Sequence, residues 1–287
     1  MKLADRFAIV TGSSQGFGYA IARCFVQEGA SVLLCARTAG DLEAAAEQLR
    51  AAAAPGAQVF AERADVSSET DVSHLAEIVE KKFGKLDILV LNAGVYGPKG
   101  SIEEVSWSAW SQAISINFMG TVFCCRMFLP SLRRAARGKI LLISGGGATK
   151  PLPFLSAYAA SKAAVVRFGE TLAEELREAG IDVNSIAPGA LNTRLLEEVL
   201  SAGPGKVGQS FYEASLRQKE SGGTPLERGA ELCVYLASSE SDGITGKLIS
   251  AVWDPWTDFA AHRQDLEKTD VYTLRRIVPG ERGLPWG

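Results

Sequence analysis

The chain has 287 residues, of which 47% are hydrophobic and 22% are charged, and its formal net charge is −3. This length and balance fit one large α/β domain or two small ones, with an ample core in either case. The chain has no basic excess, which argues against a nucleic-acid partner.

The N-terminus and the cysteines indicate a compartment. The first residues carry charges and lack the apolar stretch of a signal peptide, and we find no apolar run of the about 18 residues that span a membrane. The five cysteines show no CxxC pair and lie in segments with helix or strand patterns. We interpret them as buried free thiols, so we expect a cytoplasmic protein without a metal site or a membrane contact.

A glycine-rich turn follows the first predicted strand. Residues 7–10 form an apolar run typical of a buried parallel strand, and a helical pattern covers residues 19–28. The glycines between them permit a tight turn and a close approach of the backbone to a phosphate, whose charge a helix N-terminus stabilises. This strand, turn and helix predict dinucleotide binding by Gly12, Ser14, Gln15, Gly16, Phe17 and Gly18.

The second predicted strand, residues 31–36, ends beside Arg37. An NAD site usually carries an acid for the ribose here, about 20 residues after the glycines. Ala36 and Arg37 provide none, whereas a guanidinium matches the 2′-phosphate of NADP. NADP is therefore favoured over NAD, although Arg37 also fits a solvated surface residue and Gln15 stands where a second basic residue would help.

Strands and helices then alternate strictly. Strand patterns cover residues 59–61, 86–91, 139–143, 181–187 and 247–252, and helical patterns cover 39–53, 68–83, 106–134, 154–179 and 226–237. Such alternation predicts a Rossmann-type, doubly wound parallel sheet with helices on both faces, here a single domain of residues 1–252. Ligands bind beyond the carboxyl ends of the strands in such a sheet.

Tyr158 and Lys162 stand four residues apart in the predicted helix 154–179. They therefore share one helical face, although such pairs occur on many helices. A lysine ammonium near a phenol favours the phenolate, so we expect Lys162 to lower the pKa of Tyr158. A tyrosine of lowered pKa can act as a general acid or base.

Two segments depart from the alternation. Residues 189–225 predict one or two short helices in a mobile loop, either a substrate lid or a loop without a catalytic role. Residues 253–287 form a C-terminal extension in which Trp253 and Trp256 suit either the substrate pocket or a subunit contact. The extension is expected to pack on its own domain or on a partner subunit.

Residues 5–252 resemble the short-chain dehydrogenase/reductase family, in its single-domain branch. Gly12, Gly16 and Gly18 resemble its cofactor loop, and Asn117, Ser144, Tyr158 and Lys162 resemble its catalytic tetrad. Further cofactor contacts that the resemblance implies are the adenine-contacting pair Asp65 and Val66, the sheet-steadying motif Asn92, Ala93 and Gly94, and the nicotinamide-contacting Pro188, Gly189 and Thr193.

The resemblance implies an NAD(P)-dependent oxidoreductase that interconverts a secondary alcohol and a ketone, with NADPH-linked carbonyl reduction favoured. Tyr158 is then the general acid, Lys162 lowers its pKa and binds the nicotinamide ribose, Asn117 holds a water in a proton relay, and Ser144 stabilises the carbonyl oxygen. The family also implies a small-molecule substrate and a homodimer or homotetramer.

The expected serine position is the main departure from the family pattern. The family's serine usually lies thirteen residues before the tyrosine, and Gly145 occupies that position here. Either Ser144 takes the role, or it is missing, with Thr149 and Ser156 as other nearby hydroxyls. Two alternative functions stay open: a cofactor-binding sensor or scaffold with little turnover, and a dehydratase or epimerase of the same fold.

Overall fold

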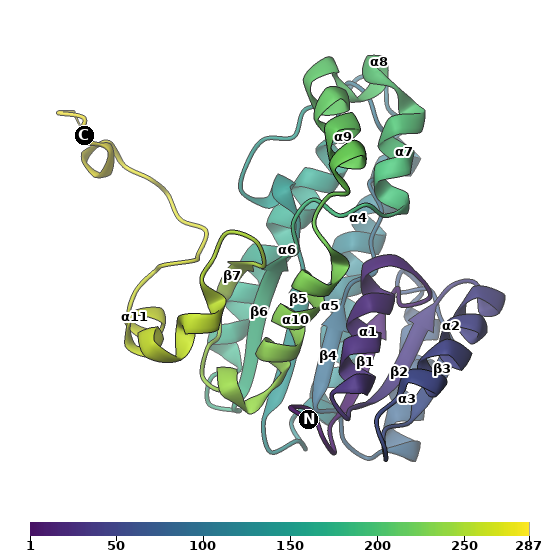
Figure 1. Ribbon diagram of the computed structural model, residues 1–287. Helices are drawn as coiled ribbons and strands as arrows, with labels where there is room; N and C mark the ends of the chain where they lie inside the picture. Colours follow the sequence, from purple (N-terminus) through teal and green to yellow (C-terminus); the bar gives the residue numbers. More distant parts are fainter. Residues whose placement is uncertain (287) are drawn as a thin grey trace.

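A parallel sheet forms the centre of the computed structural model, which describes residues 1–286 (Figure 1). Its strands are β1 (Phe7–Thr11), β2 (Ser31–Ala36), β3 (Val59–Arg63), β4 (Ile88–Leu91), β5 (Gly138–Ile143), β6 (Ile181–Ala187) and β7 (Lys247–Ser250). They pair in the order β3-β2-β1-β4-β5-β6-β7, and every pair is parallel. The strand order reverses between β1 and β4, the point where such sheets bind ligands.

Helices cover both faces of the sheet, as predicted (Figure 1). One face carries α1 (Gly16–Gln27), α2 (Ala39–Ala52) and α10 (Leu226–Ala237), and the other carries α3 (Glu69–Lys82), α5 (Gly120–Leu132) and α6 (Ser156–Glu175). Successive strand residues point to opposite faces, so Ala8 and Val10 pack in the first core and Phe7 and Ile9 in the second. The predicted Rossmann-type fold is confirmed.

The boundaries of two predicted helices are wrong. α1 begins at Gly16 rather than at residue 19, because the glycine turn leads directly into the helix. α6 begins at Ser156 rather than at residue 154 and ends at Glu175. Phe154 adopts a φ of +66°, which is incompatible with a right-handed helix, and a turn follows the last helical residue.

The predicted helix at 106–134 contains a π-helical turn. The segment consists of α4 (Trp107–Ile114), the π-turn η1 (Ser115–Met119) and α5. By length and composition alone, the run 107–132 could cross a membrane, which corrects the expectation that no run is long enough. In the structure its residues Cys124 and Phe128 are buried against the sheet.

The segment after β6 forms three helices rather than one or two. They are α7 (Arg194–Ala202), α8 (Pro204–Val207) and α9 (Gln209–Ser221), and they rise beyond the carboxyl ends of the strands (Figure 1). Lys99 Nζ lies 3.3 Å from a carboxylate oxygen of Glu198 on α7. An ion pair thus joins this helical segment to the loop after β4.

The C-terminal extension packs on its own domain up to about residue 274. It contains η4 (Trp256–His262), α11 (Arg263–Lys268) and η5 (Pro279–Arg282), and short helical turns elsewhere are η2 (Gly146–Ala148) and η3 (Ser239–Ser241). Trp256 and Phe259 are buried, and the Tyr272 carbonyl accepts a 2.7 Å hydrogen bond from Leu248 N on the edge strand. Beyond this contact the chain leaves the body as an arm (Figure 1).

The opposite end of the sheet holds a buried ion network. Lys139 at the start of β5 is fully buried, and its Nζ lies 2.8 Å from carboxylate oxygens of both Asp182 and Asp242. Asp182 also accepts from Arg137 and from Gly243 N. A buried charge needs such partners, so this network fixes the amino ends of β5 and β6.

All five cysteines are free thiols. Cys24 is half-buried, whereas Cys35, Cys124, Cys125 and Cys233 are buried in the sheet and in its covering helices. Burial disfavours a thiolate and raises the pKa of each buried thiol, that of Cys125 to about 12. These thiols are packing residues, as the sequence predicts.

Candidate active site

A cavity of about 1190 Å³ opens at the carboxyl ends of the strands. It extends from the end of β2, past the switch point between β1 and β4, to α6 and α7. The predicted site residues that line it are Gly12, Ser14, Gln15, Gly16, Phe17, Arg37, Asp65, Val66, Asn92, Ala93, Gly94, Ser144, Tyr158, Lys162, Pro188, Gly189 and Thr193. Two predicted residues, Gly18 and Asn117, lie behind its wall.

The glycines after β1 are required by close packing. Gly12 adopts a φ of +64°, and a Cβ there would lie 2.9 Å from the Cα of Ala93. A Cβ on Gly18 would overlap the Gly12 carbonyl oxygen and lie 2.5 Å from Asn92 Nδ2. Gly18 therefore allows the start of α1 to fold against the loop, so that the N–H groups at this helix N-terminus face the cavity region.

Asn92 holds this loop against the end of β4. Its Nδ2 donates to the carbonyl oxygens of Thr11 and Gly12, each at 3.0 Å. In return, Thr11 Oγ1 accepts from the backbone N–H groups of Asn92 and Ala93. The two central strand ends are thus locked together, which is the steadying role that the sequence predicts for Asn92 and Ala93.

The other predicted cofactor contacts form the end of the cavity near β2 and β3. Arg37 is exposed there directly after β2. Asp65 is held in place because its carboxylate accepts from Ser67 N and Oγ, while its own N–H donates to Asp71. Asp41 on the first turn of α2 also lines this end, a charged neighbour that the sequence analysis did not consider.

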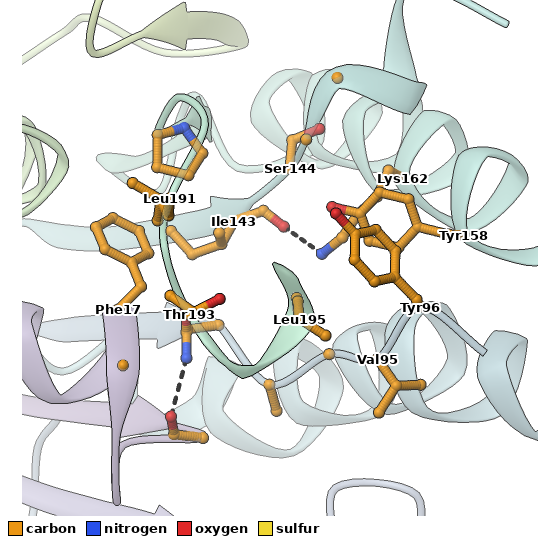
Figure 2. Close-up of a pocket in the computed structure, with 18 of the residues that line it drawn as sticks. Phe17, Val95, Tyr96, Ile143, Ser144, Tyr158, Lys162, Leu191, Thr193 and Leu195 are labelled. Carbon is orange, nitrogen blue, oxygen red and sulfur yellow. Dashed lines mark hydrogen bonds between the residues drawn. The ribbon is translucent and has the colours of Figure 1, made fainter. Parts of the chain in front are cut away.

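Tyr158 and Lys162 project from the first turns of α6 and are both nearly buried. Lys162 Nζ donates a 2.7 Å hydrogen bond to the Ile143 carbonyl at the end of β5 (Figure 2). The same Nζ lies 5.7 Å from the centre of the Tyr158 ring. The sequence prediction that these side chains share one face of a helix is confirmed.

The predicted direction of the Tyr158 pKa is wrong for this structure. Burial raises the pKa of Tyr158 above its ordinary value, and the neighbouring Tyr96 raises it further. Burial also lowers the pKa of Lys162 to about 8. Removal from water disfavours both charged forms, and at the observed separation this effect outweighs the attraction of the lysine for a phenolate.

Asn117 lies in the π-turn and connects two walls of the site. Its Oδ1 accepts from Val95 N at 2.9 Å, and its Nδ2 donates to the Val95 carbonyl and to Ser161 Oγ. The π-turn, a feature common at functional sites, directs this side chain inward. Asn117 thereby fixes the loop after β4 against α6, which carries Lys162.

The hydroxyls near the expected serine position differ in their surroundings. Ser144 borders the cavity, but its Oγ is buried and has no hydrogen-bond partner within residues 1–286. Thr149 is exposed at the cavity edge, whereas Ser156 lies outside the lining and accepts from Trp110 Nε1 at 3.1 Å. Ser144 and Thr149 therefore remain candidates, and Ser156 serves to position Trp110.

Tyr96 is a site residue that the sequence analysis missed. Its ring meets the ring of Tyr158 edge to face, with centroids 4.6 Å apart. Figure 2 shows this pair beside Lys162 on one side of the pocket, Phe17 and Thr193 on the other, and Leu195 of α7 between them. In the sequence, Tyr96 is marked only by its position two residues after Gly94. That signal is weak without knowledge of the contact with Tyr158 on α6.

Comparison with known proteins identifies the class. The model of the short chain dehydrogenase family matches residues 6–203. The L-fucose dehydrogenase of Oryctolagus cuniculus is 34% identical over 84% of this chain and 81% of its own length. An NAD-dependent oxidoreductase of Mycobacterium tuberculosis is 33% identical over 86% of this chain and 94% of its own.

A solved structure agrees with these sequence relatives. L-Sorbose reductase from Gluconobacter frateurii, complexed with NADPH and L-sorbose, superposes with a TM-score of 0.77 and 29% identity, covering 87% of this chain and 97% of that one. The fold and site thus define an oxidoreductase of the nicotinamide-dinucleotide type. The chain belongs to the short-chain dehydrogenase/reductase family.

Proposed function

We propose that this protein reduces a ketone to a secondary alcohol with NADPH as the cofactor, and catalyses the reverse oxidation with NADP. The observation that carries the proposal is the meeting of two independent features in one cavity. The glycine turn after β1 lies at one part of it, and the Tyr158 and Lys162 pair of α6 lies at another. The two features come from distant parts of the sequence, and hydride transfer needs both.

The residues of the cavity fit a dinucleotide. Any side chain at Gly12 or Gly18 would collide with neighbouring atoms of the turn. Because both residues are glycines, the backbone there can approach a pyrophosphate closely. Pro188, Gly189 and Thr193 line the part of the cavity nearest Phe17, where they suit the nicotinamide amide. The bound nicotinamide supplies the hydride, and the protein provides position and electrostatics.

The roles of the side chains follow from their surroundings. Tyr158 keeps its proton because burial raises its pKa, so it is ready to donate that proton to the carbonyl oxygen of a ketone. Lys162, with a pKa near 8, can return a proton to the phenolate that remains. Ser144 Oγ, which has no partner within residues 1–286, is the hydroxyl available to stabilise the same carbonyl oxygen after a change of rotamer.

Arg37 supports NADP as the preferred cofactor. It is the first residue after β2, it lines the cavity, and no carboxylate stands at Ala36 or Arg37 to hold a ribose 2′-hydroxyl. A guanidinium there matches a 2′-phosphate. Asp41 is the nearby feature that opposes this preference, since its carboxylate would repel the same phosphate.

The helices α7 to α9 are proposed to act as a lid over a small or medium-sized substrate. Phe211 and Ser215 of α9 line the cavity together with Leu195 of α7, so these helices shape the substrate end.

We further propose a cytoplasmic homodimer or homotetramer, as is usual for the family. Sedimentation of the purified protein would reveal the assembly, and a monomer would contradict that part.

The replacement of Tyr158 by Phe tests the mechanism. Tyr158→Phe removes the proton donor and leaves the glycine turn intact, so turnover of a ketone panel should fall by about 10² to 10⁴-fold. NADPH affinity, measured by fluorescence titration, should stay within a few-fold of the wild type. Turnover near the wild-type level would refute the role of Tyr158, and a wild-type protein that binds NADPH without turnover would favour a sensor or scaffold.

A further inference from the structure

Gly145 lies directly against the hydroxyl of Tyr158. A Cβ built on Gly145 would overlap the Tyr158 hydroxyl oxygen and lie 3.2 Å from Cζ and 3.5 Å from Cε1 of the same ring. Real Cβ atoms do not make such contacts. Any side chain at position 145, including the serine that the family pattern leads one to expect, would therefore have to displace Tyr158.

The backbone does not explain this glycine. Gly145 has a φ of −172° and a ψ of 173°, an extended conformation that every amino acid adopts. The next residue, Gly146, is exposed, and a Cβ built there would meet no atom within 4 Å. Within this turn, the contact with Tyr158 is thus specific to position 145.

The Tyr158 ring has little freedom to move aside. It is 9% exposed, and the ring of Tyr96 packs against it with centroids 4.6 Å apart. Its backbone belongs to the first turn of α6, where Ala159 N bonds to the Leu155 carbonyl at 3.0 Å. A group added at Gly145 would therefore press on the Tyr158 hydroxyl and tilt the ring.

We propose that Gly145 is a positioning residue: because it has no side chain, the Tyr158 hydroxyl can lie against the segment after β5, and introducing serine at this position lowers activity. In this chain the Tyr158 hydroxyl occupies the space that a side chain at position 145 would need. For its catalytic consequence the inference rests on the proposed function.

Three variants test the catalytic consequence. Gly145→Ser and Gly145→Ala should each lower kcat by about 10²-fold, the loss expected for a misplacement of about 1 Å, while KM for NADPH stays near the wild-type value. Gly146→Ala is the matched control in the same turn and should retain wild-type kcat. Wild-type kcat in Gly145→Ser, or an equal loss in Gly146→Ala, would overturn the inference.

A thermal double-mutant cycle tests the contact without any turnover. Gly145→Ala should lower the melting temperature by several degrees in the wild type but much less in a Tyr158→Phe background, because that background lacks the overlapping oxygen. Equal losses in both backgrounds would overturn the inference. If the wild type shows no turnover, the proposed function fails, and the cycle still decides whether Gly145 makes room for Tyr158.

Discussion

The lysine in the site, Lys162, is a buried cation that forms no ion pair within residues 1–286. Lys162 is 5% exposed and donates to the Ile143 carbonyl, and burial lowers its pKa from 10.5 to about 8. The folded protein therefore binds this proton less tightly than the unfolded chain does. Below about pH 8 the ammonium is retained at a cost to stability, and that cost disappears as pH rises toward the unfolded pKa.

Replacement of Lys162 exposes this cost. Between pH 8 and 10.5 the unfolded wild type binds more protons than the folded wild type, because the pKa of Lys162 is lowered by folding. The unfolding free energy of the wild type should therefore rise over this range by up to about 3 kcal/mol, compared with that of Lys162→Met. Urea unfolding at several pH values measures the difference. The exposed Lys81→Met is the control, and a difference that stays constant with pH would contradict the lowered pKa.

Arg37 is expected to distinguish the two cofactors. Arg37→Ala should weaken NADPH binding by about 10 to 100-fold, the effect of losing a charge-assisted hydrogen bond, and leave NADH binding unchanged. Parallel fluorescence titrations measure both affinities. Arg63→Ala is a matched control, since Arg63 pairs in register with Ala36 at the next strand end but lies outside the cavity lining. Equal losses for NADPH and NADH would remove Arg37 as the phosphate contact.

At the scale of elements, the two ends of the sheet serve different purposes. The carboxyl ends carry the cavity, whereas the amino ends of β5 and β6 carry the buried network of Lys139 and Asp182. Removing one member of a buried ion pair leaves the other charge without compensation. Mutations at this end should therefore affect stability and leave cofactor affinity unchanged.

Asp182 provides the test. Asp182→Ala should lower the unfolding free energy by about 3 kcal/mol or more, because Lys139 is fully buried and loses its closest buried partner. Asp242→Ala, which removes the partly exposed partner, should cost less. Chemical denaturation measures the unfolding free energy, and a separate NADPH titration without denaturant measures binding. A loss of unfolding free energy below about 1 kcal/mol for Asp182→Ala would indicate that water solvates Lys139.

Elements that repeat a local pattern could be predicted from the sequence, and contacts between distant segments could not. The alternating strands and helices gave the parallel sheet, and the spacing of Tyr158 and Lys162 gave their common helical face. Three features arise where segments far apart in the chain meet. They are the raised pKa of Tyr158, its contact with Tyr96, and the closeness of Gly145 to the Tyr158 hydroxyl. They depend on burial and on distances, which residue spacing does not contain.

At the scale of the whole molecule, the C-terminal extension divides into two parts. Residues up to about 274 bury Trp256, Phe259 and Leu266 and cover the free edge of β7. Beyond them the arm is exposed or half-exposed through residue 286, with Trp286 68% and Ile277 52% exposed. The first part completes the fold, and the arm contributes no large buried side chain to it.

Two truncations separate these parts. Deletion of residues 276–287 should leave the melting temperature of a monomer nearly unchanged. Deletion of residues 253–287 removes the buried side chains of Trp256, Phe259 and Leu266. The burial that is lost amounts to about 5 to 9 kcal/mol at 1.5 to 3 kcal/mol each, so this deletion should abolish stable folding. Differential scanning calorimetry with sedimentation checks both. A marked loss of stability or of assembly on the shorter deletion would place the arm in a subunit contact.

The buried cysteines allow local unfolding of this protein to be measured by alkylation. Only a thiolate reacts with an alkylating reagent, so buried cysteines react when their surroundings open. Cys35 and Cys124 lie in the core on one face of the sheet, and Cys233 on α10 lies in the core on the other face. Half-buried Cys24 provides a faster reference in the same molecule. Mass spectrometry of the alkylated peptides would then report, without any engineered cysteine, whether the two faces of the sheet open separately.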